Sequence, residues 1–319
     1  MSQNQEPKNA AEVTSPPSVT AASATDRRSA VSTKPRRLVV AVLLLLGCGY
    51  AATQFLFPKD IRPDALRHAL TPDAVRQGRR LLGLLDSRYG GSERYRHHRV
   101  TQVEYTDAWA SGLMQRVGSP WLPGERLRLT FAHGTDSSRL DFLSGPRQSQ
   151  SWGIQQWQTY TVASGQRKFA PNKDIKFWLP TLEYFLEMPF RVGEAEIVAH
   201  AGERTLGNQI YDLIFLTWGS PTPHRHMDQY VLWIRRSDGI LEFAEYTVRD
   251  VAPFIVGCIH YEDLRDVDGI LVPFRLTLGD CPGKPGLLHR QTLSSAQFRP
   301  DLPIRDLVPE PDRRADKAD

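Results

Sequence analysis

Most of the chain beyond Val100 alternates between apolar and polar positions with a period of two, the spacing typical of β-strands. The alternating segments are separated by Gly, Pro, Asn and Asp residues, which favour turns. One tight hairpin is marked by residues 236–239, Arg-Ser-Asp-Gly. The pattern predicts about eleven strands, at residues 100–108, 126–131, 138–143, 151–162, 197–201, 210–218, 229–234, 241–249, 254–264, 270–278 and 287–298.

Two segments instead repeat their apolar residues at the helical spacing of three and four. The first begins at Thr71, an N-cap residue followed by Pro72, and is expected to end at the Gly-Gly pair 90–91. The second covers residues 172–187 and is expected to kink or divide at Pro180. Helix, strands, helix and strands therefore follow one another, which is typical of an α+β fold.

The strands are apolar on both faces, which bears on how the sheet is covered. In residues 211–218, Leu213 and Phe215 point to one face while Ile214 and Leu216 point to the other. A sheet with one wet face would alternate more cleanly. Either the sheet encloses a core and is also covered outside, or its interior includes an apolar cavity. Because a long antiparallel sheet has to curl, we predict a strongly curved, half-open barrel with the two helices covering the concave side.

The N-terminal part of the chain shows a different pattern. Residues 1–37 are polar, without apolar periodicity, and are predicted to be a disordered tail. Residues 38–57 contain no charged residue and would span about 30 Å as a helix, the thickness of a bilayer core. The tail carries six basic and three acidic residues, so the positive-inside rule keeps it in the cytoplasm. This predicts a bacterial inner-membrane protein with a single span and a periplasmic body.

A lipid anchor is the alternative reading of the same segment. Leu45-Leu46-Gly47-Cys48 resembles a bacterial lipobox, in which the cysteine is lipidated and becomes the mature N-terminus. If translation begins at Val31, the basic residues before the apolar run form an ordinary signal-peptide start. Both alternatives tether the body to the outer face of a membrane.

The remaining boundaries follow from composition. Residues 58–70 are polar and predicted to be a linker, residues 71–298 form the folded domain, and residues 299–319 form a second disordered tail. The chain has a net charge of +4, most of which belongs to the first tail, so the body is nearly neutral. A nearly neutral body argues against a nucleic-acid partner.

Two further cysteines, Cys258 and Cys281, lie on neighbouring predicted strands in a compartment where disulfides persist. Reflection about the intervening turn brings Cys258 near Leu278, which leaves both a disulfide and two free thiols open.

Four segments in this order resemble the periplasmic lipoprotein-carrier superfamily, the LolA/LolB-like proteins. They are the helix end at 88–95 (RYGGSERY), the strand pair at 202–212 (GERTLGNQIYD), the hairpin at 228–234 and 239–247, and the hairpin at 261–273. The resemblance covers roughly residues 71–298 and implies a half-open antiparallel barrel whose helices close an apolar cavity for acyl chains. It carries no catalytic motif and no cofactor. Because this chain has a membrane tether and long polar tails, it fits a tethered acceptor, sensor or lipid-handling protein better than a soluble shuttle.

One cluster suggests chemistry instead. His224, His226 and Asp228 match the first part of the H-x-H-x-D-H metal motif of metallo-β-lactamase-like hydrolases. The motif's last histidine is Gln229 here, and the β-α repeats of that fold are absent. We therefore predict no metal site and no enzyme activity, and keep a metal-dependent hydrolase as an alternative. Glu242 and Glu245 are predicted to point to opposite faces of one strand, which argues against a catalytic carboxylate pair.

Aromatic residues gather in the middle of the body, where the sheet should curl around the second helix. We predict that an acyl-chain cavity there is lined by Trp152, Trp157, Trp178, Leu179, Leu182, Phe185, Phe215, Tyr230, Trp233 and Phe243. The sequence thus predicts a non-catalytic domain that binds a lipid, an acyl chain or a lipoprotein at a membrane. A structural envelope module with a filled core is the remaining alternative.

Overall fold

The computed structural model describes residues 57–303 and Leu307. The chain divides into two units, residues 1–50 and 51–319, and every described residue belongs to the second. The predicted first tail, the predicted anchor apart from Phe57, and most of the predicted second tail lie outside the described residues. Within the described part, no helix combines the length and the apolar character needed to cross a membrane.

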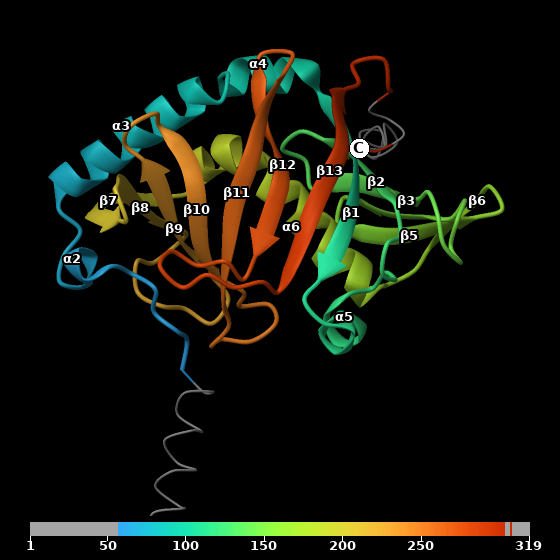
Figure 1. The fold of residues 1–319 in the computed structure, drawn as a ribbon, viewed down its shortest axis with the longest axis horizontal. Coiled ribbons are helices and arrows are strands. Elements are labelled where there is room, and N and C mark those ends of the chain that lie inside the picture. The colour runs from blue at the N-terminus through green and yellow to red at the C-terminus, as the bar shows by residue number, and fades with distance from the viewer. Residues whose placement is uncertain (1–56, 304–306, 308–319) are drawn as a thin grey trace, which may run out of the picture. The chain divides into compact units, whose positions relative to one another are not determined.

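The body is built on one antiparallel sheet of thirteen strands, which is not closed into a barrel (Figure 1). Its spatial order is β6-β5-β4-β3-β2-β1-β13-β12-β11-β10-β9-β8-β7. The strands are β1 (Val100–Trp109), β2 (Leu127–Ala132), β3 (Ser137–Phe142), β4 (Ser151–Gln155), β5 (Gln158–Ala163), β6 (Gln166–Phe169), β7 (Ile197–Leu206), β8 (Gln209–Thr217), β9 (Gln229–Arg235), β10 (Ile240–Thr247), β11 (Val256–Val267), β12 (Ile270–Leu278) and β13 (His289–Phe298).

Two meanders of hairpins make up the sheet. One contains β1 to β6 and the other β7 to β13, and they meet where β1 pairs with β13, with Thr101 opposite Phe298. The predicted α+β class and antiparallel sheet are confirmed, but the strand count of eleven was too low. Residues 151–162 form a hairpin because Gln156 and Trp157 adopt φ values of 47° and 63°, which makes a tight turn. All four residues of β6 are exposed, so this strand has no apolar alternation to reveal it.

The helices are few and short apart from two. They are α2 (Asp64–Arg67), α3 (Pro72–Arg88), α4 (Ser92–His98), α5 (Gly112–Gly118), α6 (Lys173–Arg191) and the 3-10 turn η1 (Val192–Glu194). The two helices predicted from the sequence are α3 and α6. Thr71 caps α3 by accepting from the Ala74 N–H, and Asn172 caps α6 by accepting from the Ile175 N–H.

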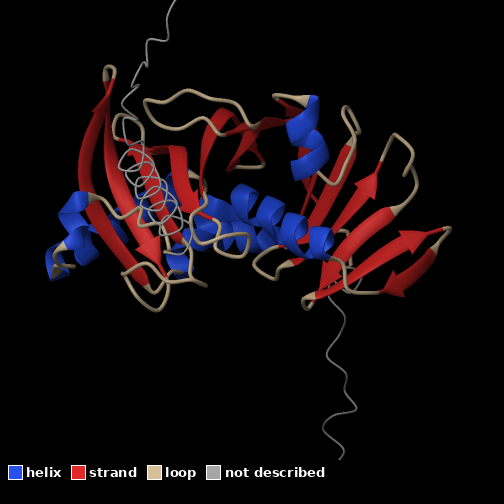
Figure 2. Ribbon diagram, turned by 90° about the horizontal axis from the view of Figure 1, so that it is seen from below, coloured by secondary structure: helices blue, strands red, loops and turns tan. Residues whose placement is uncertain are grey.

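Helix α6 lies along the concave side of the sheet, where strands are seen on both sides of it (Figure 2). It is a single helix through Pro180 and does not divide there. Tertiary packing outweighs the lost backbone hydrogen bond, because Leu179, Leu182 and Phe185 are almost fully buried in the core.

Helix α3 packs against β7 rather than lying along the concave face. At Gly78 an added Cβ would lie 2.7 Å from the Ala199 carbonyl carbon, so only glycine permits this approach. The same helix also adds Leu81, Leu82 and Leu85 to the core around α6. The expectation that both helices cover the concave side therefore holds for α6 alone.

The convex side of β7 to β10 is covered as well. Leu213 and Phe215 pack there under Ile61 and Leu66, in a cluster separate from the main core. The structure thus differs from our expectation of a free linker at residues 58–70, since Leu66 is only 4% exposed. Its apolar residues are isolated among polar ones, so no periodicity revealed that this segment is packed.

Candidate functional site

The ten residues predicted to line an acyl-chain cavity do not share one space. The core around α6 holds Trp152, Trp178, Leu179, Leu182, Phe185 and Tyr230. The convex-side cluster holds Phe215, Trp233 and Phe243. Trp157, at the β4–β5 turn, is 56% exposed. Six of the ten therefore face the concave interior, where α6 and its neighbours fill the space.

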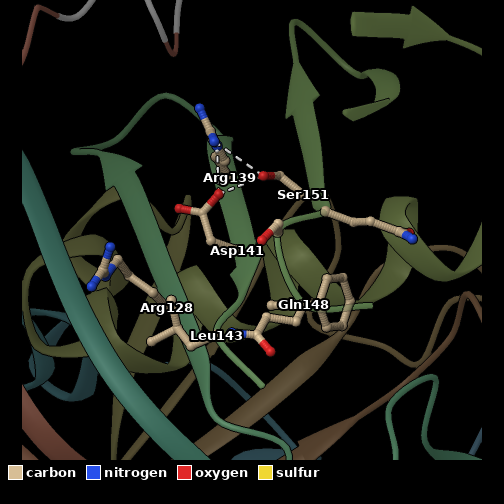
Figure 3. A pocket seen from close by; sticks show the side chains of 9 residues that line it. Arg128, Arg139, Asp141, Leu143, Gln148 and Ser151 are labelled. Carbon is tan, nitrogen blue, oxygen red and sulfur yellow. Dashed lines mark hydrogen bonds and ion pairs between the residues drawn. The ribbon is translucent and has the colours of Figure 1, made fainter. Parts of the chain in front are cut away.

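The two best-defined hollows of the described chain are open and lined largely by polar groups. One, of about 310 Å³, lies on β2 and β3 and the loop to β4 (Figure 3). Its charged groups are already paired: Arg139 lies 2.7 Å from Asp141, and Arg128 lies 2.6 Å from Glu104. The hollow therefore offers no unpaired charge to a ligand.

A buried polar cluster lies where α6 passes the turn between β2 and β3. The Glu187 carboxylate accepts hydrogen bonds from the Tyr95 hydroxyl at 3.0 Å and from the Gly134 N–H at 3.1 Å. The Arg191 guanidinium, also 3.0 Å from Asp136, lies 3.4 Å from the same carboxylate. Burial raises the pKa of Glu187 to about 7, although the Arg191 charge opposes the shift.

Tyr95 is held in place by aromatic stacking on both His133 and Phe190, with ring centroids 3.8 and 4.1 Å away. His133 Nδ1 lies 2.8 Å from the Tyr95 carbonyl oxygen, and Nε2 lies 2.6 Å from the Thr101 hydroxyl. Burial lowers the pKa of His133 to about 4, so its ring is neutral near pH 7. Stacking and hydrogen bonds thus tie Tyr95 and His133 into the core.

Glu183 lies one helical turn before Glu187 and differs from it. Both of its carboxyl oxygens are buried outside good hydrogen-bond geometry, as is the Ser138 hydroxyl, which is nevertheless close enough to oppose the rise in the pKa of Glu183. Burial, together with the neighbouring Glu187 charge, raises the pKa of Glu183 well above its usual range. The side chain is therefore a neutral acid in an apolar core, an arrangement that costs stability.

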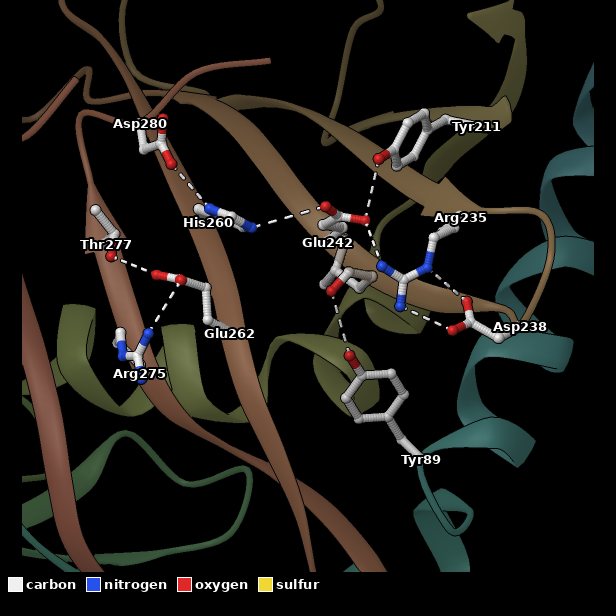
Figure 4. A network of polar contacts seen from close by, with 11 residues as sticks. Tyr89, Tyr211, Arg235, Asp238, Glu242, His260, Glu262, Arg275, Thr277 and Asp280 are labelled. Carbon is white, nitrogen blue, oxygen red and sulfur yellow. Dashed lines mark hydrogen bonds and ion pairs between the residues drawn. The ribbon is translucent and has the colours of Figure 1, made fainter. Parts of the chain in front are cut away.

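A second polar network lies on the convex side of β8 to β12 (Figure 4). Glu242 accepts from the Tyr211 hydroxyl at 3.0 Å and from Arg235 at 2.8 Å, and its other oxygen lies 3.7 Å from His260 Nε2. His260 Nδ1 lies 2.8 Å from Asp280. Within the described chain, His260 has no hydrogen bond to a hydroxyl or thiol group. The network therefore contains no activated nucleophile of the serine- or cysteine-hydrolase kind.

Beside this network lies the second hollow, of about 280 Å³, whose lining includes Arg235, Glu242, His260 and Glu262. Glu262 is itself engaged, since it accepts from Arg275 and from the Thr277 hydroxyl. Every charged group named here already has a partner, so ligand binding would have to break an ion pair.

The prediction that Glu242 and Glu245 point to opposite faces was wrong. The β9–β10 register shifts between Leu241 and Phe243, so Glu242 reaches the convex side together with Glu245, which accepts from Trp233 Nε1. A β-bulge inserts one residue and re-aims the side chain at that point, which strict alternation does not anticipate. The two carboxylates still bind different partners.

Cys258 and Cys281 are joined by a disulfide with an S–S distance of 2.03 Å. Cys258 is on β11, and Cys281 follows Asp280 in the loop after β12. The β11–β12 register places Ile259 opposite Leu278, which brings the two cysteines to the same end of the hairpin. The bond therefore fixes the loop that carries one end of the convex-side network.

A fully hydrogen-bonded buried carboxylate at the end of β1 was not predicted from the sequence. Asp107 accepts from Trp109 Nε1 at 2.9 Å and from Trp121 Nε1 at 3.0 Å, and lies 2.8 Å from His289 Nδ1. Trp109 also stacks on His289 at 4.4 Å. His289 is 182 residues from Asp107 and reaches it only through the β1–β13 pairing, so no local motif marks the cluster.

His224 and His226 lie in the exposed loop before β9, with ring centroids 5.6 Å apart. Asp228 points away to accept from the Thr247 hydroxyl and the Arg249 N–H. Among the described residues, no group of three or more His, Cys, Asp or Glu side chains is placed to hold a metal ion.

Comparison with solved structures finds chains that are similar in fold. A LolA superfamily protein from Nitrosomonas europaea is 14% identical with a TM-score of 0.47, covering 72% of this chain and 96% of that one. A DUF1329 family protein from Desulfovibrio piger is 11% identical with a TM-score of 0.48, covering 74% and 97%. A domain described as an outer membrane lipoprotein-sorting protein, from Vibrio parahaemolyticus, is 8% identical with a TM-score of 0.45, covering 73% and 97%.

No protein-family model matches the chain, and no curated protein matches it either. One of the similar structures is described as a LolA superfamily protein, the group that the sequence resembles. Because the sequence identities are only 8–14%, a functional proposal has to rest on the side chains of this chain.

Proposed function

We propose that this protein is a membrane-tethered, extracytoplasmic domain that binds the acyl chain of a lipid or a lipidated partner and catalyses no reaction. The acyl chain would occupy the concave side of the sheet, in the space that α6 fills in this structure. The disulfide supports the extracytoplasmic location, because disulfides persist in oxidising compartments.

The observation that carries the proposal is the way in which α6 is seated. Its inner face is apolar, with Leu179, Leu182 and Phe185 buried, but the same face carries the buried carboxyl of Glu183, which makes no hydrogen bond of good geometry. A buried polar group without a partner weakens packing by about 1–3 kcal/mol. A helix so seated can be displaced at lower cost than an apolar one, and its displacement would expose an apolar surface suited to an acyl chain.

The inner polar cluster gives no support to a catalytic role. Glu187 and Glu183 are fully buried, so no substrate can contact them in this state. Because the interior is filled, a structural module of the envelope is the second candidate.

The test is a titration of the full chain in detergent with a fluorescent fatty acid, supported by native mass spectrometry. The variant Glu183→Leu should seat α6 more firmly and weaken acyl binding about tenfold, because the closed state gains population. The control is Lys176→Leu, which changes an exposed position of the same helix. A wild-type protein that takes up no acyl chain would contradict the proposal and favour the structural module, and so would equal affinity of wild type and Glu183→Leu.

A further inference from the structure

Exposed apolar side chains are concentrated at one end of the sheet. Of the fourteen large apolar residues that are exposed in the described chain, ten belong to residue 57 or to the segments 110–122, 218–228, 248–256 and 279–288. We call these ten residues the apolar rim. Its most exposed members include Phe57, Leu113, Val117 and Val251, at 66%, 74%, 84% and 56%.

The antiparallel register explains why these segments lie together. β1 ends at Trp109 opposite His289, where β13 begins, and β12 ends at Leu278 opposite the same residue. β10 ends at Thr247 opposite Val256, where β11 begins. The loops after β1, β8, β10 and β12 therefore project from one end of the sheet, the end at which α5 lies in Figure 1.

The chain also enters the body at this end. The Lys59 N–H donates to the Pro253 carbonyl oxygen at 2.9 Å, and the Arg249 side chain donates to the carbonyl oxygens of Lys59 and Pro253. Phe57, the first described residue, is thereby fixed at the rim. It is also the last residue of the twenty-residue apolar run that the sequence predicts to lie in a membrane.

Helix α5 presents its apolar residues outward on a fixed support. An added Cβ at Gly118 would lie 2.7 Å from the Trp109 ring, so the helix packs tightly on that side chain. Gln115 is buried on the inner face, and its amide donates to the Trp121 carbonyl oxygen. Because Gln115 and Gly118 hold the helix in place, Leu113 and Val117 lie exposed on its outer face. Their exposure therefore does not come from fraying of the helix.

The charge of the rim suits a lipid surface. Arg116, Arg225 and Lys284 are exposed basic residues of these segments, and the exposed Lys59 lies two residues after Phe57. Three acidic residues belong to the segments, and only Asp250 is exposed. Asp228 accepts from the Thr247 hydroxyl and the Arg249 N–H, and Asp280 lies 2.8 Å from His260. Exposed cations beside apolar side chains are the features by which proteins bind the interface of anionic membranes.

We propose that the apolar rim rests on the bilayer that holds residues 38–57, with its apolar side chains in the headgroup–acyl boundary. This inference rests on the proposed tether but not on acyl-chain uptake. Because the apolar run ends at Phe57 and Lys59 is bonded to the rim, too little chain separates the tether from the body for the rim to stand far from the membrane. The body is thereby held in one orientation, with the end that carries α5 facing the lipid.

The experiment uses the full chain in nanodiscs that hold one copy and contain anionic phospholipid with a diazirine in one acyl chain. After photolysis, digestion and mass spectrometry, lipid adducts are expected in the peptides that contain residues 110–122 and 248–256. The peptide that contains Leu84 is the internal control, because Leu84 is 56% exposed on α3 but lies outside the rim. The double variant Leu113→Glu with Val117→Glu should lose at least fivefold of the 110–122 adduct, whereas Leu84→Glu should leave it unchanged.

Adducts in the tether peptide, residues 38–57 or what remains of it after processing, test the proposed tether separately. If that peptide is labelled and the rim peptides are labelled no more than the Leu84 peptide, the tether stands and the rim inference is overturned. If the tether peptide is not labelled, both fail. A second copy of the chain could instead cover the rim. The chains would then be dimers in detergent, the double variant would separate them, and single-copy nanodiscs would show no rim adducts. That result also overturns the inference.

Discussion

The two polar clusters of this protein are built from the same three groups in different surroundings. Inside the sheet, Glu187 accepts from a tyrosine hydroxyl at 3.0 Å and lies 3.4 Å from an arginine. Outside it, Glu242 accepts from a tyrosine hydroxyl at 3.0 Å and from an arginine at 2.8 Å. The Glu187 side chain is 0% exposed and that of Glu242 is 18% exposed. Desolvation, rather than geometry, should therefore decide how much each cluster contributes to stability.

The largest expected effect is the loss of the inner carboxylate. Glu187→Leu removes the partner of the Tyr95 hydroxyl and one of the three carboxylates within 4 Å of Arg191, so buried polar groups lose hydrogen bonds. We expect the free energy of unfolding to fall by about 3–5 kcal/mol, measured by urea denaturation. A loss below about 1 kcal/mol would show that the inner cluster behaves like a surface pair.

The disulfide beside the outer network should have the next effect. Replacing both Cys258 and Cys281 by serine opens a loop with a sequence separation of 23 residues. The chain-entropy model gives a loss of about 3 kcal/mol for a loop of this size. Urea denaturation of the double variant and of the reduced wild type should agree. Agreement at a value near zero would mean that the outer network holds the loop without the bond.

Glu183 adds to the comparison because replacing it is expected to increase the stability of the fold, whereas replacing Glu187 is expected to decrease it. Glu183→Leu should raise the free energy of unfolding by about 2 kcal/mol at pH 8, since a buried acid without a hydrogen bond of good geometry is replaced by an apolar side chain. Lys176→Leu, on the exposed side of α6, serves as the control. A destabilised Glu183→Leu protein would indicate that the carboxyl has a partner in solution.

The pH dependence of the free energy of unfolding follows from Glu187 and Glu183. Burial raises the folded-state pKa of Glu187 to about 7 and that of Glu183 well above its usual range. A raised carboxyl pKa stabilises the fold below the unfolded-state value of about 4.5, and this contribution is lost as pH rises through the folded-state value. We expect stability to fall between about pH 4.5 and 8, with a smaller slope in Glu183→Leu. Identical slopes would contradict the assignment.

The smallest effect on stability is expected in the convex-side network, at Glu242. Glu242→Gln keeps the shape of the side chain and weakens pairs that are partly exposed, so the free energy of unfolding should change by less than about 1 kcal/mol. Differential scanning calorimetry at low and high salt is the measurement. A change as large as that of Glu187→Leu would remove the distinction between the two clusters.

Local patterns predicted the parts of the fold that local physics determines. Thr71 and Asn172 were readable as helix starts because capping depends on a few adjacent residues. The bulge at Glu242 and the turn at Gln156 and Trp157 could not be predicted. The alternation of apolar and polar residues marks neither an inserted residue nor a turn without glycine.

The polar clusters were missed for a related reason. Asp107 and His289 are 182 residues apart, and Tyr95 and Glu187 are 92 apart, so each pair meets only after the sheet has formed. The predicted aromatic lining was divided between two faces because Phe215 and Trp233 are covered by the 58–70 segment, whose few apolar residues gave no periodic signal.

The joint between β1 and β13 has a consequence for how the molecule forms. Nearly all other strand pairs are hairpins between chain neighbours, which close quickly, whereas the Ser294 hydroxyl bonds to the Glu104 carbonyl oxygen across 190 residues. When the chain is synthesised from its N-terminus, the β1–β6 meander can form long before β13 has been made. Helix α6 therefore lacks half of the strands that surround it until β13 is in place. Closure of this joint should be the slow folding step, and pulsed hydrogen exchange should show the amides that bond β1 to β13 gaining protection together and last.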